Sequence, residues 1–350
     1  MKWQVFLQHQ YPGNLWDEWD TLNNIWHNKN PMLSSSFIRL ISSYLNPLLY
    51  VALGTDSDNS KTMLLLERKK PGIWQVFKPS QATLACIVST PNSDFSWSEL
   101  FRSIPTLCYR IDFISLDPNE CKDIIDSQTS SELITKAINM QINLESDFDQ
   151  YWEARPKKLK SNIKRYQSRI EEEQGQVRFE HLMSVPDIKA GTDRYGLLES
   201  KGWKGKLKTA LHPGNFQGQF YRQFLSAQAE QQAALIIEMY VGNRMIASRL
   251  CCFQNGLLIA LKTTFDETYK RYAVGRLLLK ELIRWGFSRH DIKLIDFYTN
   301  ASSEQLEWAT TRRNMFDASL YSLSLPGKML STLSNVKKRL KGSEDLLSSD

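Results

Sequence analysis

The clearest hydrophobic pattern in the chain is a series of apolar segments in its second half, separated by short polar turns. Ala233–Val241 is rich in β-branched and aromatic residues, which predicts a strand. Further strands are expected at Arg244–Phe253 and Leu257–Thr264, because Gly242-Asn243 and Asn255-Gly256 are two-residue hairpin signals. The pattern therefore predicts an antiparallel meander.

After this meander the apolar spacing changes from the period of a strand to that of a helix. A helix is expected over Val274–Arg289, because Leu278, Leu282 and Trp285 fall on one face. The remaining expected elements are a strand at Lys293–Tyr298, a helix at about Glu304–Asn314 and a strand near Ala318–Leu325. Strands mixed with helices in this order indicate an α/β (α+β) fold.

The first half contains a faint copy of the same pattern. Strands are expected at Leu48–Gly54, Thr62–Arg68 and Gly72–Lys78, and a shift of 184 residues lays Asp112 on Asp296. The same ungapped shift lays Thr62–Arg68 on the second strand of the later meander, which suggests a duplicated fold. Between its third strand and Asp112, the first copy has the segment Ala82–Arg102, which contains no glycine and no basic helix start, so only the second copy is expected to keep a phosphate site.

A basic segment connects the two halves. Asp149–Gln174 is expected to form a long helix that is interrupted near Pro156 and ends at Gly175. The predicted organisation is an N-terminal domain at 1–148, this connecting helix at 149–175, a second domain at 176–328, and an amphipathic helix with a tail at 329–350. The last segment is expected to dock on the protein, with peripheral contact to an anionic membrane as the alternative.

Composition narrows the function classes. The 350 residues carry a formal net charge of +6, but residues 1–150 have 12 Lys and Arg against 17 Asp and Glu, so the remainder has a net charge of +11. The basic half would attract an anionic ligand. Neither a membrane span nor a signal peptide is expected, and the odd count of 5 cysteines favours a cytoplasmic location. Scattered histidines argue against a metal site.

The candidate ligand site is the start of the predicted helix at Val274. A helix N-terminus offers free backbone N–H groups and a partial positive charge, which suit a phosphate group. Gly275 would let that backbone approach a ligand closely, and Lys270, Arg271 and Arg276 add positive charge around it.

Residues 150–325 resemble the GNAT acyltransferase superfamily, and within it the CelD-type, FemAB-like branch. Lys270-x-x-Ala273-x-Gly275 is similar to the superfamily's pyrophosphate loop, and Asp296-Phe297 to the Asp-Phe that follows the cofactor helix in this branch. The basic segment Lys157–Arg165 and the segment Glu199–Lys204, which contains Trp203, resemble two further motifs of the branch. The implied fold is two tandem GNAT-like domains, each a mixed, mostly antiparallel sheet flanked by helices.

The resemblance implies an N- or O-acyltransferase that uses acetyl-CoA or another acyl-CoA and acts by direct attack in a ternary complex. Its expected cofactor contacts are Leu261, Thr263, Lys270, Arg271, Ala273, Val274, Gly275 and Arg276. Trp203 and Lys204 are expected to line the acceptor cleft. Asp296 and Glu238 are candidates for the general base, and Tyr298 for the acid that protonates the leaving thiolate.

Two alternatives stay open. The Tyr-Lys pair that the branch carries soon after Asp-Phe is absent, which favours a non-catalytic binding or scaffold protein of GNAT shape. The basic helix and the two-copy layout favour a FemAB-like transferase that uses aminoacyl-tRNA, although no RNA motif with interleaved aromatics appears. The acceptor is expected to be a small molecule or a polysaccharide or peptide precursor.

Overall fold

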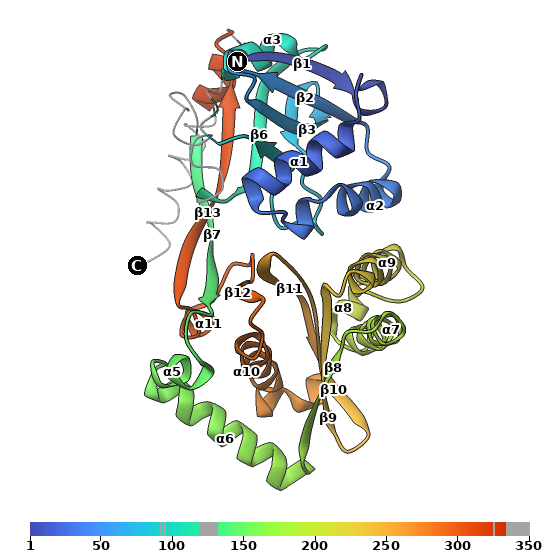
Figure 1. Ribbon diagram of the computed structural model, residues 1–350, viewed down its shortest axis with the longest axis vertical. Coiled ribbons are helices and arrows are strands. Elements are labelled where there is room, and N and C mark those ends of the chain that lie inside the picture. The colour runs from blue at the N-terminus through green and yellow to red at the C-terminus, as the bar shows by residue number, and fades with distance from the viewer. Residues whose placement is uncertain (92, 94–95, 119–131, 325, 334–350) are drawn as a thin grey trace. The chain divides into compact units, whose positions relative to one another are not determined.

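The structure is a computed structural model that describes residues 1–91, 93, 96–118, 132–324 and 326–333 (Figure 1). Unit 1 contains Met1–Ile38, Leu45–Ala137 and the described residues from Asn314, whereas unit 2 contains Arg39–Tyr44 and Ile138–Arg313. The chain leaves unit 1 within strand β7 (Glu132–Asn143) and returns within β13 (Thr311–Tyr321). The units therefore divide the chain differently from the two domains expected from the sequence, at 1–148 and 176–328.

Unit 2 is built on a mixed sheet with the strand order β7-β12-β11-β10-β9-β8. The strands are β8 (Val177–Leu182), β9 (Ala234–Val241), β10 (Arg244–Gln254), β11 (Gly256–Phe265) and β12 (Ile292–Asp296). Neighbouring strands are antiparallel except β11 and β12, which are parallel. The predicted meander is confirmed, because each of its strands lies within one residue of the expected bounds.

The helices of unit 2 are α5 (Phe148–Glu153), α6 (Lys157–Gln174), α7 (Val185–Lys201), α8 (Trp203–Lys206), α9 (Phe216–Glu230), η3 (Glu267–Tyr272), α10 (Val274–Phe287) and α11 (Ser303–Leu306). The predicted break at Pro156 and the helix start at Val274 are confirmed. The helix expected over Glu304–Asn314 is wrong, since α11 ends at Leu306 and β13 begins at Thr311.

Unit 1 repeats this architecture with the strand order β1-β2-β3-β4-β6-β13, and β5 pairs with β3. Its strands are β1 (Lys2–Leu7), β2 (Leu49–Thr55), β3 (Lys61–Lys70), β4 (Gly72–Val76), β5 (Ile87–Ser89) and β6 (Cys108–Leu116). The helices of the first half of the chain are η1 (Gln8–Gln10), α1 (Leu15–His27), η2 (Pro31–Leu33), α2 (Ser35–Leu45) and α3 (Trp97–Ser103). Of the predicted amphipathic C-terminal helix Met329–Lys341, residues 334–341 lie outside the described residues.

The register of the parallel strands matches between the two units. In unit 1, Gly72 lies opposite Cys108 and Gln75 lies opposite Asp112. In unit 2, Gly256 lies opposite Ile292 and Ile259 lies opposite Asp296, so every partner is displaced by 184 residues. Each pair of strands also has a register shift directly after its glycine. The chain thus contains two copies of one fold, as predicted from the faint repeat.

Candidate functional site

Strand β11 loses its pairing with β12 halfway along its length. The two strands pair from Gly256 to Ile259, whereas the segment Ala260–Phe265 pairs with β10 only. A cavity of about 210 Å³ lies beside this part of β11. It is lined by Met140, Arg249, Ala260, Leu261, Lys262, Thr263, Leu279, Phe297, Thr299 and Gln305. The separated strands therefore leave space next to a backbone edge that can bind a ligand's amide groups.

The turn before α10 has the backbone geometry of a tight helix start. Ala273 caps the helix in the left-handed region, with φ at 49°. A Cβ placed on Gly275 would meet only the Phe265 ring, at 3.9 Å, so the space in front of this residue is open. By contrast, the side chain of Val274 is buried in the core, and only its backbone is available to a ligand. These observations fit an anion close to the first amides of α10.

The basic residues around this turn differ in their partners. Arg271 pairs with Glu173 and also donates to the Tyr272 hydroxyl, and Arg276 pairs with Glu304. Lys270 has no acidic partner in the part of the chain that the structure describes, and it lines a second cavity. Lys270 is therefore the predicted basic residue whose charge is most available to an anionic ligand.

The second cavity has a volume of about 430 Å³. It is lined both by residues predicted to contact the cofactor and by residues predicted to contact the acceptor substrate. Its lining consists of Glu199, Gly202, Trp203, Lys204, Thr263, Thr264, Phe265, Glu267 and Lys270. The side chain of Trp203 is exposed, and the backbone N–H of this residue donates to Glu267 Oε1 at 2.9 Å. Thr263 lines both cavities, so each of them borders β11 at this residue.

Glu199 is the buried carboxylate of this cleft. It accepts hydrogen bonds from Lys204 Nζ at 2.5 Å, the Leu211 backbone N–H at 2.7 Å and the Tyr195 hydroxyl at 3.2 Å. Burial, together with the Glu199 charge, raises the pKa of Tyr195 well above its ordinary value. In the sequence, Glu199 stands out only as part of the segment Glu199–Lys204. Its spacing from Ile188 and Tyr195, which places it on the buried face of α7, is the signal that identifies it.

Asp296 is enclosed by donors. Its carboxylate accepts hydrogen bonds from Asn139 Nδ2 and Gln141 Nε2, both at 2.7 Å, and it pairs with the buried Arg313. Burial raises the pKa of Asp296, while Arg313 and the hydrogen bonds oppose that rise. The aspartate lines neither cavity. The following Tyr298 has φ at 42°, and Arg313 lies 5.5 Å from the centre of its ring.

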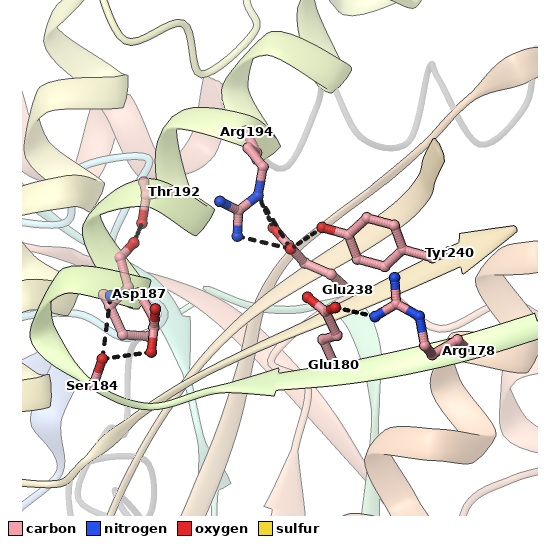
Figure 2. Close-up of polar contacts among 9 residues, drawn as sticks. Arg178, Glu180, Ser184, Asp187, Thr192, Arg194, Glu238 and Tyr240 are labelled. Atoms are coloured by element: carbon pink, nitrogen blue, oxygen red, sulfur yellow. Dashed lines mark hydrogen bonds and ion pairs between the residues drawn. The ribbon is translucent and has the colours of Figure 1, made fainter. Parts of the chain in front are cut away.

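Glu238 lies on β9 in a cluster with residues of α7 and its own strand, as Figure 2 shows. Arg194 donates to its carboxylate through Nε at 3.0 Å and Nη2 at 2.9 Å, and the Tyr240 hydroxyl donates at 2.7 Å. Burial is the larger cause and the hydrogen bond to Glu238 the smaller one, and together they raise the pKa of Tyr240 to about 12. Glu238 is fully buried and lines neither of the two cavities. The structure thus brings Trp203, Lys204, Thr263 and Lys270 together, and places Asp296 and Glu238 in separate ion pairs.

Among the residues that the structure describes, no group of three or more His, Cys, Asp or Glu side chains is arranged to hold a metal ion. In the same part of the chain, no helix has the length and apolar character needed to cross a lipid bilayer.

Comparisons with known proteins agree on the fold. Residues 157–306 match the family model described as acetyltransferase (GNAT) domain. The structure of FemX is similar at 9% identity with a TM-score of 0.61, covering 94% of this chain and 99% of that one. A conserved protein of unknown function from Bacteroides thetaiotaomicron is similar at 11% identity with a TM-score of 0.55, covering 88% and 98% of the two chains.

A third similar structure is the C-terminal domain of a putative lysylphosphatidylglycerol synthetase from Agrobacterium fabrum. It is 10% identical with a TM-score of 0.50, and the alignment covers 82% of this chain and 88% of that domain. The search of curated protein sequences returned no match.

Proposed function

We propose that the chain is an acyl-CoA-dependent N- or O-acyltransferase, because residues 157–306 match the acetyltransferase (GNAT) domain model and the fold is similar to that of FemX. In this proposal unit 2 binds acetyl-CoA or another acyl-CoA. Unit 1 has no donor site, because the equivalent segment of its sequence lacks the glycine and the basic helix start.

The observation that carries the proposal is the meeting of three features at the end of β11. The strand has an edge beyond Ile259 without pairing to β12, the space before Gly275 is open, and Lys270 has no acidic partner among the described residues. A pyrophosphate would bind the first amides of α10, and the amide groups of the pantetheine arm would pair with the edge of β11. This arrangement would place the thioester near Thr263, which lines both cavities.

Direct attack then needs few side chains. The acceptor's amine or hydroxyl attacks the thioester carbonyl, the C–N or C–O bond forms, and the C–S bond breaks as the CoA thiolate leaves. Backbone N–H groups on the edge of β11 would stabilise the oxyanion. The acceptor's proton would pass to Glu267, the exposed carboxylate that lines the cleft, and Tyr298 remains the candidate to protonate the thiolate.

Asp296 and Glu238 receive a different role in this proposal. Each is buried against an arginine and accepts further hydrogen bonds, so its lone pairs are already used. We assign them to positioning: Asp296 would hold the end of β12, and Glu238 would hold α7 against the sheet. Trp203 and Lys204 would contact the acceptor, a small molecule or a polysaccharide or peptide precursor. The fold shared with the putative lysylphosphatidylglycerol synthetase domain adds lipid-linked acceptors to those worth screening.

The test is calorimetric titration of acetyl-CoA and free CoA into the wild type and two Gly275 variants. Gly275→Asp should abolish binding through crowding and charge repulsion, yet it should fold, because an acidic residue suits the first turn of a helix. Gly275→Ala adds only the Cβ, for which there is room, and should weaken binding less. Lys189→Glu, an exposed charge reversal on α7, is the matched control and should bind like the wild type.

A second candidate donor is aminoacyl-tRNA. Helix α6 exposes Lys157, Lys158, Lys164, Arg165 and Arg169, a basic face of the kind that contacts phosphates. If tRNA is the donor, tRNA should bind the wild type with a steep salt dependence, and Gly275→Asp should leave that binding unchanged. Tight CoA binding that is lost in Gly275→Asp would instead favour the first proposal.

A further inference from the structure

Arg249 is a buried cation without a counter-charge. It lies on β10 opposite Thr263 of β11, and only 7% of the residue is exposed. Its Nε has no hydrogen-bond partner, and the groups that act on its charge are the Cys251 thiol and the Tyr195 hydroxyl, with no carboxylate among the described residues. Burial lowers the pKa of Arg249, which reflects how unfavourable this surrounding is for the charge.

The guanidinium group lines the cavity of about 210 Å³ beside β11. Lys262 also lines this cavity, with its Nζ 5.7 Å from the centre of the Tyr221 ring, and no carboxylate is part of the lining. Thr263, Thr299 and Gln305 add neutral polar groups, and the rest of the lining is apolar. A cavity of this composition is suited to a small anion that carries some apolar carbon.

A buried arginine normally pairs with a carboxylate or a phosphate, because an uncompensated charge in the interior is costly. The guanidinium fork matches a carboxylate with two parallel hydrogen bonds. The cavity is too small for the nucleotide of CoA, whose phosphates have a separate place at the start of α10. A ligand that brings its own carboxylate therefore explains the unpaired arginine most directly.

We propose that this cavity is a carboxylate subsite in which Arg249 pairs with a carboxylate of the transferred acyl group or of the acceptor. The placement of that carboxylate next to the reacting thioester rests on the proposed acyltransferase function. The binding of a carboxylate by Arg249 does not, and it can be measured separately.

The test compares succinyl-CoA with acetyl-CoA by calorimetry in the wild type, Arg249→Met and Arg249→Lys. If the carboxylate belongs to the acyl group, the wild type should bind succinyl-CoA at least about tenfold more tightly than acetyl-CoA. Arg249→Met should bind both equally, and Arg249→Lys should restore part of the difference.

If the carboxylate belongs to the acceptor, the wild type should bind both thioesters equally, and the CoA-loaded protein should bind glutamate in a manner that Arg249→Met abolishes. The proposal is overturned if neither the thioester preference nor glutamate binding depends on Arg249.

Thermal unfolding supplies a readout that a packing role would not give. Arg249→Met should raise the melting temperature of the unliganded protein, because it removes a buried unpaired charge, and should remove the stabilisation by free succinate. A lower melting temperature together with unchanged succinate stabilisation would overturn the proposal. If the wild type binds no CoA, the acyltransferase proposal fails, and succinate stabilisation that depends on Arg249 would still support the carboxylate subsite.

Discussion

Arg313 on β13 forms an ion pair with Asp296 on β12, and both side chains are almost completely buried. The pair joins the end of β12 to the strand that follows α11. Asp112, at the equivalent register position of unit 1, also pairs with an arginine: Arg110 donates to it through Nε at 2.7 Å and Nη2 at 2.9 Å. That second pair is partly exposed. The difference in burial makes the two aspartates an internal comparison.

We expect Asp296→Asn to destabilise the protein by about 3–5 kcal/mol, because the buried Arg313 would lose the negative charge of Asp296. Asp112→Asn should cost less, about 1 kcal/mol or below, since solvent screens Arg110. Urea unfolding followed by circular dichroism measures both. Unchanged stability in Asp296→Asn, combined with a loss of turnover by about 10²–10⁴-fold, would instead identify Asp296 as the general base.

The two basic residues next to the helix start should respond differently to charge reversal. Lys270→Glu should weaken CoA binding, more at low ionic strength than at high, because an exposed attraction is screened by salt. Arg271→Glu should have a smaller effect, since Glu173 already offsets that charge. Calorimetry at two salt concentrations measures this, with Lys189→Glu as the control. An equal, salt-independent loss in both variants would mean that these residues support the turn rather than attract the ligand.

Ala273 adopts a backbone conformation that favours glycine. Its φ of 49° lies in the left-handed region, which costs a residue with a Cβ roughly 1 kcal/mol. Ala273→Gly should therefore stabilise the protein by up to about 1 kcal/mol, and it should bring the turn closer to the glycine-rich form of the loop. The midpoint of urea unfolding checks this expectation. A loss of stability would show that the methyl group contributes packing that outweighs the strain.

Much of the fold could be predicted because its signals are local. Hairpin dipeptides bound the strands β9, β10 and β11, and the proline at 156 breaks the connecting helix. The helix expected to continue past Glu304 failed because polar residues near Thr311 carry no strong period, and pairing within a sheet decided their conformation. Long-range pairing likewise placed β13 against β6, which no local pattern indicates.

The candidate site was less predictable for the same reason. The motif led to Gly275, Lys270 and Trp203, which the structure places around one cleft or at the helix start beside it. The roles of Glu199 and Arg249 depend on which side chains from other elements surround them, and the sequence does not contain that information. A charged residue inside an apolar run, as Arg249 is between Ala247 and Cys251, is the signal that marks such a position in advance.

Binding of acyl-CoA at the start of α10 can be measured by glycine-selective ¹⁵N NMR without knowledge of the acceptor. The signal of Gly275 is assigned from its loss in Gly275→Ala, and those of Gly54 and Gly72 in unit 1 by the same means. On titration with CoA, we predict a saturable shift of the Gly275 amide, while Gly54 and Gly72 stay unchanged. Saturable CoA binding that leaves the Gly275 amide signal unshifted, or the absence of any CoA binding, would contradict a cofactor site at the start of α10.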